Sequence, residues 1–451
     1  MQNNHLRFFG WLALIVLIAF GLRLGAAYYW QTRVVTNDSG LYFGDSETYW
    51  RLAEAVSQRK PYQFEEWQVF RMPGYPLMLA PLFWLYNGEP PVMAARIQNA
   101  LIGSLLVAAV GAFAFQLFPN RTIALWACSF AACDPCTIIT NVWVLSETPF
   151  CLAMIGQLSA LVAAIRVNRK SQQVLYSAWF AVLSALTVYF RPSWLYFGLF
   201  MLIAYVVYFA LFRYFGKQAK NPQTKEFYTP DAHTIRRAII ILLVFVPVFC
   251  LCMAPWWVRN HRVTGRFVAT TLQMGPSLYD GLSPTATGAS DMAFTDEFRH
   301  IEKENATPNS RDTYEYRVNE RMKKASIDWA KKHPGRVCEL AVVKFVRLWN
   351  VWPNEPAFSG HIVRIVVFVT YTPILFMAVA GFGLTWRYRF DFTVVILPAI
   401  YLTMLHVIFV SSLRYRVPAM LCLMIPAAFM AYIVSQFRWC KNSYWIVKPK
   451  T

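Results

Sequence analysis

The sequence predicts an all-α polytopic membrane protein with about ten transmembrane helices, membrane-surface helices and a small outer (periplasmic) helical domain. Of its 451 residues, 57% are hydrophobic and only 15% are charged, whereas a soluble domain carries about 25% charged residues. The apolar residues form continuous blocks of about 20, the length that crosses about 30 Å of hydrocarbon as a helix. Strands of a membrane barrel would alternate apolar and polar residues instead.

The apolar blocks define the expected spans in chain order. They cover residues 8–30, 91–117, 121–141, 147–166, 174–190, 193–213, 238–258, 362–386, 391–411 and 415–437. The first block has a basic start, but it is long, contains Arg23 and is followed by no clear cleavage site, so we expect a retained helix rather than a signal peptide. The block 73–86 is too short and proline-rich to span, and we expect it to lie along the membrane face.

One long polar segment, 259–361, separates the apolar blocks. It contains a predicted amphipathic helix, about 310–332, with Val318 and Met322 on its apolar face. Residues 342–352 then combine tryptophans, aliphatic residues and basic residues, a composition typical of an interfacial segment.

Three units follow from these segments. The first is an N-terminal transmembrane module, 1–258, which includes a catalytic first outer loop at 31–90. The second is an outer domain at 259–361. The third, 362–451, comprises the last transmembrane helices and a cytoplasmic tail.

The net charge of +19 resides largely in short loops and the C-terminal tail. Basic loops mark the cytoplasmic side of a membrane protein, so nucleic-acid binding is not implied. With ten spans, the basic loops all fall on one side, which places both termini inside and 31–90 and 259–361 outside. The basic residues are Arg166, Arg169, Lys170, Arg213, Lys217, Lys220, Lys225, Arg236, Arg237, Arg387, Arg389, Arg438, Lys441, Lys448 and Lys450.

The first outer loop carries a polar stretch, Gly44–Tyr49, directly after the first span. Charges close to a bilayer are costly unless they line a wet cavity or take part in chemistry. Asp45 is therefore the candidate general base, which would take a proton from an acceptor hydroxyl. The alternative, compatible with this, is that Asp45 caps a helix over about 46–57. Glu47 and Tyr49 are substrate-binding candidates, although Glu47 also fits a solvated surface position.

The same loop continues with Arg71-Met72-Pro73-Gly74-Tyr75-Pro76. The prolines restrict the backbone and the glycine permits a turn there. An arginine held in this way can neutralise a lipid phosphate through paired donors, or can contact an ordinary headgroup. Arg71 and Tyr75 are therefore substrate-binding candidates.

A second acidic candidate, Glu147, lies between the third and fourth spans on the predicted outer side. It could begin the fourth span or join Asp45 in a site. A divalent metal between Asp45 and Glu147 is an open alternative, because hard cations prefer oxygen ligands. No histidine or cysteine cluster indicates zinc.

Arginines recur at the predicted outer ends of the spans. The positive-inside tendency disfavours them in short outer loops, so their presence indicates an anionic partner at that face, either lipid headgroups or a phosphate-bearing substrate. The substrate-binding candidates at these ends are Arg191, Arg259, Asn260, Arg414, Tyr415 and Arg416.

Taken together, the motifs resemble those of the glycosyltransferase C superfamily, in the bacterial branch similar to protein O-mannosyltransferases and aminoarabinose transferase. The resemblance covers most of the chain, and its motifs occur in the expected order. They are Gly-Asp-Ser-x-x-Tyr (44–49), Arg-x-Pro-Gly-Tyr-Pro (71–76), Ser-Glu-Thr (146–148), Pro-Trp-x-x-Arg-Asn-x-x-x-x-Gly (255–265), His-Pro-Gly (333–335) and Arg-Tyr-Arg-x-Pro (414–418).

The resemblance implies an inverting glycosyltransferase in the cytoplasmic (inner) membrane, with its active site facing outside. Such an enzyme would move a hexose or pentose from a polyprenyl-phosphate carrier to an acceptor hydroxyl. Asp45 matches the position of the family's base, and Arg71 matches a residue that contacts the carrier phosphate in some relatives. Glu147 falls near a second acidic position. Protein mannosyltransferases carry adjacent acidic residues where this chain has Asp45-Ser46, and the acceptor stays open among lipid, glycan and protein.

A transporter or flippase of lipid-linked saccharide is the main competing hypothesis, because it would also need many spans and a polar cavity. It predicts internal repeats with helices broken at the midplane, and the sequence shows no such repeat or break. A non-catalytic membrane assembly or sensor protein is a second competing hypothesis, but it would leave the clustering of Asp45, Arg71 and Glu147 on one face as an accident.

Overall fold

The computed structural model describes residues 2–34, 40–218, 232–304, 312–352, 360–385 and 393–437. In these residues the regular structure is helical, and the one β contact is an isolated bridge between Phe64 and Trp67. The all-α fold class is therefore confirmed.

The helices of the bundle follow the predicted spans closely. They are α1 (Gln2–Tyr29), α4 (Val92–Leu117), α5 (Arg121–Cys133), α6 (Pro135–Val142), α7 (Glu147–Arg166), α8 (Lys170–Phe190), α9 (Phe197–Gln218), α11 (Ala232–Thr264), α16 (His361–Thr385), α18 (Leu397–His406) and α19 (Val417–Phe437).

Among the described residues, eight helices are long and apolar enough to cross a membrane, or nine if the bent pair α5 and α6 counts as one span. The chain is thus a multi-pass membrane protein. The span expected at 391–411 differs from the prediction, because its helix, α18, has only ten residues. The last part of that apolar block, from 407 onward, forms a turn and a loop instead.

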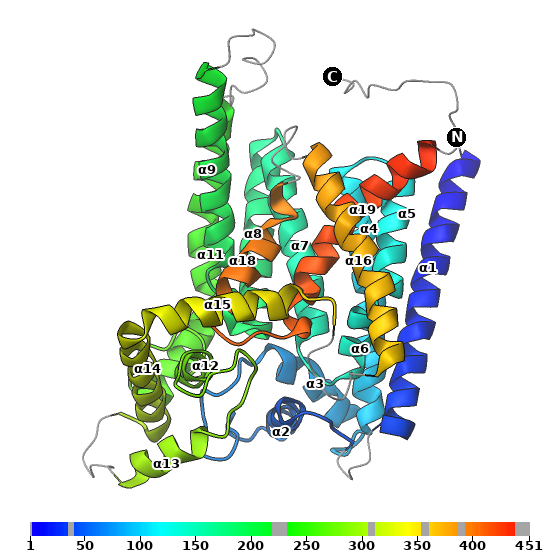
Figure 1. Cartoon of the computed structure of the whole chain (residues 1–451). Coiled ribbons are helices and arrows are strands. Elements are labelled where there is room, and N and C mark those ends of the chain that lie inside the picture. Colours follow the sequence, from blue (N-terminus) through cyan, green and yellow to red (C-terminus); the bar gives the residue numbers. More distant parts are fainter. Residues whose placement is uncertain are drawn as a thin grey trace.

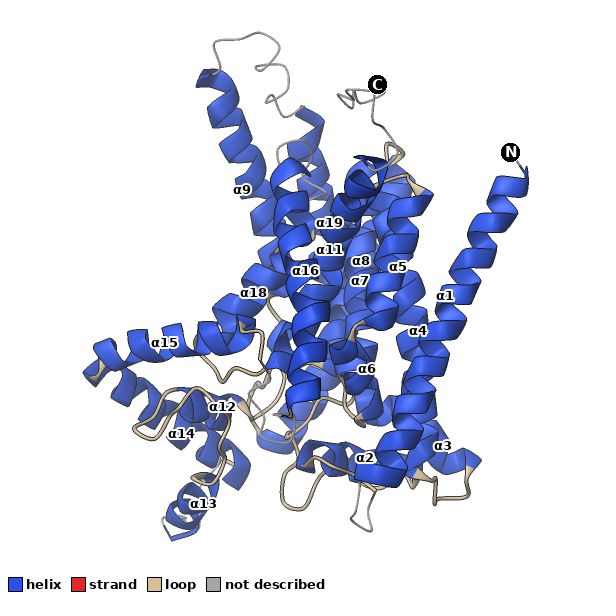
Figure 2. Cartoon of the chain, turned by 45° about the vertical axis from the view of Figure 1, so that its right-hand side comes forward, coloured by secondary structure: helices blue, strands red, loops and turns tan. Residues whose placement is uncertain are grey.

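Shorter helices occupy one end of the bundle and its side. They are α2 (Gly44–Ser57), α3 (Gly74–Leu85), α12 (Met274–Gly281), α13 (Thr295–Glu304), α14 (Tyr314–Lys332) and α15 (Pro334–Trp349). Figure 1 shows α2, α3 and α12 to α14 at the end opposite the start of α1 and the finish of α19. In Figure 2, α15 runs across the direction of the bundle helices and extends away from them.

Of the basic residues that predict the cytoplasmic side, those at the described ends of α7 and α8 lie at the end of the bundle where α1 starts. Arg166 ends α7 and Lys170 begins α8 at that end (Figure 1). Eight residues of the prediction lie outside the described residues: Lys220, Lys225, Arg387, Arg389, Arg438, Lys441, Lys448 and Lys450.

A break between α5 and α6 bends this span by 52°. Pro135 has no amide hydrogen to continue the helix, and the carboxylate of Asp134 caps α6 instead. The guanidinium of Arg23, which is only 1% exposed, donates to the carbonyls of Ala131 (3.1 Å) and Ala132 (3.3 Å) at the break. Arg23 therefore satisfies carbonyls that the break leaves without helical partners. The prediction of one continuous helix over 121–141 is therefore wrong, because α5 ends before Asp134 and Pro135 begins α6.

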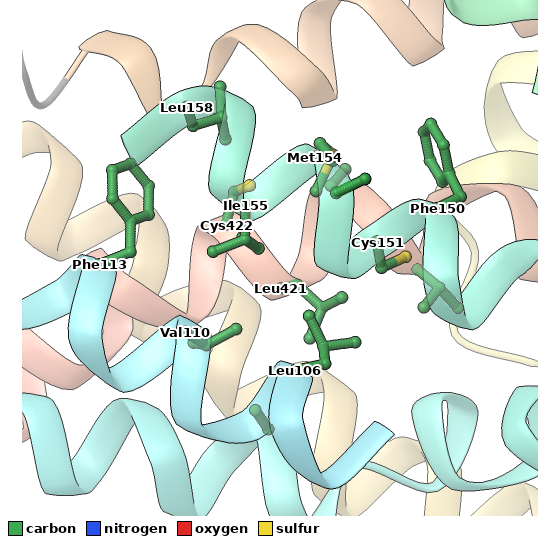
Figure 3. Close-up of a cluster of buried hydrophobic side chains, with 14 of the residues drawn as sticks. Leu106, Val110, Phe113, Phe150, Cys151, Met154, Ile155, Leu158, Leu421 and Cys422 are labelled. Carbon is green, nitrogen blue, oxygen red and sulfur yellow. The ribbon is translucent and has the colours of Figure 1, made fainter. Parts of the chain in front are cut away.

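The core of the bundle lies where α4, α7 and α19 meet. Figure 3 shows Leu106 and Val110 of α4 facing Met154 and Ile155 of α7, with Cys422 of α19 beside them. All five side chains are 2% exposed or less. The helices of this buried core lead into the start of α7 and the loop before α19, which both contribute to the candidate site.

The polar segment between α11 and α16 is anchored on the bundle and its loops. Its predicted amphipathic helix is α14, which begins after the N-cap Thr313 and ends at Lys332, with His333 as its C-cap. Val318 and Met322 are buried against Trp67 of the first loop. Hydrophobic contact therefore joins the polar segment to the loop that follows α2.

Two buried charged side chains add polar connections. The carboxylate of Glu315 in α14 accepts a hydrogen bond from the amide of Val69 (2.9 Å), and burial raises the pKa of this carboxyl to about 7. The ammonium of Lys344 in α15 donates to the carbonyls of Gly281 (2.8 Å) and Ile408 (2.6 Å). These contacts fasten two loops that carry candidate site residues.

Candidate active site

A cavity of about 440 Å³ lies at the end of the bundle next to α2 and α12. It is lined by residues of α2, the loop before α3, the start of α7, the end of α8 and the loop before α19. The polar segment supplies the opposite wall. Seven predicted site residues line this cavity: Asp45, Tyr49, Arg71, Glu147, Arg191, Arg414 and Tyr415.

Asp45 lies in the first turn of α2. The helix begins at Gly44, the N-cap position is Phe43, and no side chain caps it. The prediction that Asp45 is the N-cap is therefore wrong, because the helix starts earlier than the sequence indicated. The carboxylate instead forms an ion pair with Arg71 and lies 3.5 Å from Nη2 of Arg414, with 36% of the side chain exposed.

Arg71 is held on several sides. Its Nη1 donates to Oε1 of Gln273 at 2.6 Å, and its guanidinium lies 4.6 Å from the centre of the Phe70 ring. The charge of Arg71, helped by that of Arg414, keeps the pKa of Asp45 below its ordinary value. Asp45 is therefore ionised at neutral pH, which a general base requires, but its arginine partners weaken it as a base.

The second carboxylate belongs to Glu147, the first residue of α7. This position agrees with one of the two alternatives that the sequence left open. Its Oε1 lies 3.5 Å from Nη1 of Arg191 and 3.9 Å from Nε of Arg414. Arg414 thus lies between the two carboxylates, Asp45 and Glu147. The three arginines exceed the two carboxylates by one positive charge, and such an excess in a partly buried cavity favours a further anion.

A cation between Asp45 and Glu147 does not fit this arrangement, because the guanidinium of Arg414 lies between them. Within the described part of the chain, no three histidine, cysteine, aspartate or glutamate residues form a group that could hold a metal. We therefore derive no step through a metal.

Two tyrosines complete the polar surface of the cavity. The hydroxyl of Tyr415 accepts a hydrogen bond from Arg414 at 3.0 Å, and Arg191 lies 5.5 Å from the centre of the same ring. The hydroxyl of Tyr49 lies 3.5 Å from Oγ of Ser146. Both rings present a polar group beside the cluster of charges.

Five predicted site residues lie outside the cavity lining: Glu47, Tyr75, Arg259, Asn260 and Arg416. Glu47 points to the surface, where it pairs with Arg51 at 2.5 Å. Tyr75 is fully buried behind Tyr49, with 5.2 Å between the ring centres, and its hydroxyl donates to Asn99.

The other three bind the backbone of their own surroundings. Arg259 donates to the carbonyl of Tyr62 at 2.7 Å, and Asn260 donates to the carbonyl of Val268 at 3.0 Å. Arg416 is 1% exposed and donates to the carbonyl of Asn350. These contacts are to backbone carbonyls outside the cavity.

The cavity also contains residues that the sequence reasoning did not find. Gln273 orients Arg71, and Trp67 and Phe70 contribute aromatic walls. Arg299 of α13 also lines the cavity, 4.8 Å from the centre of the Trp67 ring, and its charge is paired with that of Asp296 at 3.4 Å. These residues belong to the polar segments that follow α2 and α11, whose sequence carries no signal of which side chains converge.

The structure and the cavity define a class, a multi-pass helical membrane protein with an arginine-rich cavity at one end of its bundle. Comparison of this chain with solved structures identifies proteins of the same fold. The chain is similar to the archaeal oligosaccharyltransferase AglB from Archaeoglobus fulgidus, in complex with an inhibitory peptide and a dolichol-phosphate. The TM-score is 0.57 at 12% identity, over 99% of this chain and 53% of AglB.

Two further similarities were found. A crystal structure of the Archaeoglobus fulgidus oligosaccharyltransferase with zinc and sulfate gives a TM-score of 0.55 at 12% identity, over 95% of this chain and 50% of that one. The crystal structure of apo ArnT from Cupriavidus metallidurans gives a TM-score of 0.41 at 12% identity, over 93% of this chain and 77% of ArnT. No protein-family model matches the sequence, and no curated protein matches it significantly.

The chain therefore has the fold of the archaeal oligosaccharyltransferase, which confirms the fold that the resemblance to the glycosyltransferase C superfamily implied. It spans about half the length of that protein.

Proposed function

We propose that this protein is a glycosyltransferase that moves a sugar from a polyprenyl-phosphate carrier to an acceptor hydroxyl. The observation that carries the proposal is the cavity in which Asp45 is paired with two of three converging arginines. The fold supports it, because the similar archaeal structure is an oligosaccharyltransferase in complex with a dolichol-phosphate.

The arginines are suited to the phosphate of the donor. Arg71, Arg191 and Arg414 leave one uncompensated positive charge in the cavity, and guanidinium groups bind phosphate oxygens through paired donors. Their positions would stabilise the negative charge that develops on the departing phosphate.

Asp45 is suited to the acceptor. The acceptor oxygen attacks the anomeric carbon of the sugar and forms the new glycosidic bond, while the bond from that carbon to the phosphate oxygen breaks. The hydroxyl proton passes to Asp45, and the bonding electron pair leaves with the lipid phosphate. A single displacement of this kind inverts the anomeric centre.

Binding of the donor would also adjust the basicity of Asp45. In the unliganded cavity, Arg71 and Arg414 lower the pKa of this carboxyl. A phosphate that attracts the same guanidinium groups would weaken their hold on Asp45 and make it a better base. The base would thus be strengthened when the donor is in place.

The orientation of the chain supports action at the outer face of the cytoplasmic membrane. The cavity lies at the end of the bundle opposite the one where Arg166 and Lys170 connect two helices (Figure 1). Positively charged connections of this kind favour the cytoplasmic side.

The broken span α5–α6 is the one observation that favours a transporter, because transporters use broken helices at their ion sites. In this chain the freed carbonyls accept hydrogen bonds from Arg23, a residue of the protein itself. Because these carbonyls already have a partner, they are not available to bind a transported ion or substrate. The enzyme remains the better proposal.

The proposal is tested with radiolabelled polyprenyl-phosphate hexoses and pentoses in purified membranes that contain envelope acceptors. The variant Asp45→Asn should lower transfer by about 10²- to 10⁴-fold, the usual contribution of a general base. The label should appear in a lipid, a glycan or a protein, which identifies the acceptor class.

Glu47→Gln is the matched control, since Glu47 is two residues away but points to the surface. It should transfer at the wild-type rate. Normal transfer by a folded Asp45→Asn variant would refute the role of Asp45. Movement of the labelled lipid across the bilayer without transfer, by wild-type protein in vesicles, would support the transporter instead.

A further inference from the structure

A second hollow of about 530 Å³ lies along the exposed side of α11 and shares no lining residue with the candidate active site. Leu251, Pro255, Val258 and Arg262 follow each other at spacings of four, three and four residues, which places them on one face of the helix. Leu251 is 74% exposed and Val258 is 48% exposed. The face that they form is therefore apolar over two turns and ends in a cation.

Two guanidinium groups close the hollow at the end where the apolar sequence of α11 stops. Arg259 directly follows the last apolar residue of the predicted span, and Arg262 lies one turn further on. Arg259 donates to the carbonyl of Tyr62 (2.7 Å) and to the side chain of Asn260 (3.2 Å). The carboxylate of Glu315 interacts with its charge from a distance, but no described residue forms an ion pair with Arg259. Arg262 forms no ion pair with any residue in the described part of the chain.

An apolar wall that ends in two arginines, neither of them in an ion pair with a described residue, matches the chemistry of a lipid with an anionic headgroup. The acyl chain would lie along Leu251, Pro255 and Val258, and the phosphate would reach both guanidinium groups, which bind phosphate oxygens well. Basic residues beside a transmembrane helix attract anionic lipids in this way.

We propose that this hollow, the α11 lipid site, binds an anionic phospholipid of the surrounding bilayer through Arg259 and Arg262. A bilayer phospholipid is favoured over the sugar donor because the hollow opens on an exposed face of the bundle and contains no carboxylate to act as base. The assignment stands independently of the proposed transfer reaction.

The lipid site is connected to the candidate active site through one tyrosine. Arg259 binds the carbonyl of Tyr62, and the hydroxyl of Tyr62 donates to the carbonyls of Arg71 (3.3 Å) and Met72 (3.2 Å). A phosphate that orders Arg259 would therefore also order the loop that presents Arg71 to the cavity.

The test is native mass spectrometry of the full chain in detergent, incubated with phosphatidylglycerol or phosphatidylcholine. Wild-type protein should retain phosphatidylglycerol preferentially. Arg262→Gln should reduce that retention about fivefold, the effect expected of one basic residue near an anionic lipid. An excess of inorganic phosphate should not displace the lipid, because phosphate alone lacks the apolar contact.

Arg266→Gln is the matched control. Arg266 lies four residues beyond Arg262, but it pairs with Asp312 at 2.7 Å and is not part of the hollow. Its loss should leave lipid retention unchanged, although the net charge falls equally.

Equal retention of the two lipids by wild-type protein would overturn the proposal. So would an equal loss of phosphatidylglycerol retention in Arg266→Gln and Arg262→Gln. A third contrary result is displacement of phosphatidylglycerol by equimolar undecaprenyl phosphate. The last result would make the hollow a carrier site. Hydrogen exchange of residues 61–73 gives a second measurement. Phosphatidylglycerol should slow exchange in wild-type protein but not in Arg262→Gln.

Discussion

Arg414 is the residue on which the charges of the cavity converge. It lies within 4 Å of Asp45 and Glu147 and donates to the hydroxyl of Tyr415. Two neighbouring carboxylates without such a partner would need a metal ion or a shared proton to offset their repulsion. Here the guanidinium of Arg414 offsets it. The cavity is therefore suited to an anionic ligand rather than a cationic one.

Asp45 and Arg71 give a pH-dependent prediction. Arg71 is the main cause of the lowered pKa of Asp45, so Arg71→Gln should raise that pKa. Because the base must be ionised, the acidic limb of the pH–rate profile should move to higher pH. The rate itself should fall about 10²- to 10³-fold, since the departing phosphate loses a donor.

Arg71→Lys keeps the positive charge and provides the comparison for this experiment. Its acidic limb should remain closer to that of wild type, even if its rate falls with the loss of paired donors. An acidic limb at the same pH in wild type and Arg71→Gln would mean that another group controls the rate.

At the scale of residues, the sequence identified some side chains that line the cavity. It could not distinguish them from similar side chains that are buried elsewhere. Arginine at a predicted outer helix end selected Arg191 and Arg414, which line the cavity. The same signal also selected Arg416, which is buried and binds the carbonyl of Asn350. An arginine that satisfies backbone carbonyls and one that faces a ligand look alike in a sequence, because only tertiary contacts distinguish them.

At the scale of elements, apolar length was a reliable predictor where a helix is continuous. The predicted block 91–117 became α4 (Val92–Leu117), and 147–166 became α7 with the same bounds. The block 121–141 was predicted as one helix but is broken at Asp134 and Pro135. Composition alone cannot show that Arg23, far away in the sequence, would satisfy the carbonyls of the break.

Close packing of α16 against α19 gives a prediction for stability. A Cβ atom on Gly381 would lie 2.1 Å from the carbonyl oxygen of Pro426, a backbone atom that cannot rotate away. Gly381→Ala should therefore force the helices apart and destabilise the fold by about 1–3 kcal/mol, as overpacking does. Thermal unfolding in detergent would show this as a lower midpoint temperature.

Gly383→Ala is the control on the same helix, because a Cβ atom there would meet nothing within 4 Å. Alanine also favours a helix by up to about 1 kcal/mol over glycine, so this variant should match or exceed the wild-type midpoint. Equal destabilisation by the two substitutions would indicate a general sensitivity of α16 rather than contact with α19.

At the scale of the whole molecule, the cavity is formed by units that are distant in sequence. Asp45 and Arg71 come from the first loop, Glu147 and Arg191 from the bundle, and Arg414 from the loop before α19. The sequence placed these residues on one predicted face, but it could not indicate how the polar segment closes the cavity. That closure depends on buried contacts such as those of Glu315 and Lys344.

Lys344 allows this dependence to be tested. Its ammonium is fully buried and holds the carbonyl of Gly281 in the polar segment and that of Ile408 in the loop leading to Arg414. Lys344→Met keeps the length and apolar stem of the side chain but removes its donors. Unpaired buried carbonyls cost about 1–3 kcal/mol, so the variant should unfold at a lower temperature.

The same substitution should also impair transfer, because the loop that carries Arg414 would no longer be fixed to the polar segment. Burial lowers the pKa of Lys344 to about 8, which leaves the ammonium largely charged at pH 7. Lys331→Met on the exposed surface of α14 provides the control and should leave stability and transfer unchanged. If Lys344→Met were less stable but transferred sugar at the wild-type rate, the polar segment would be needed for folding and not for the geometry of the cavity.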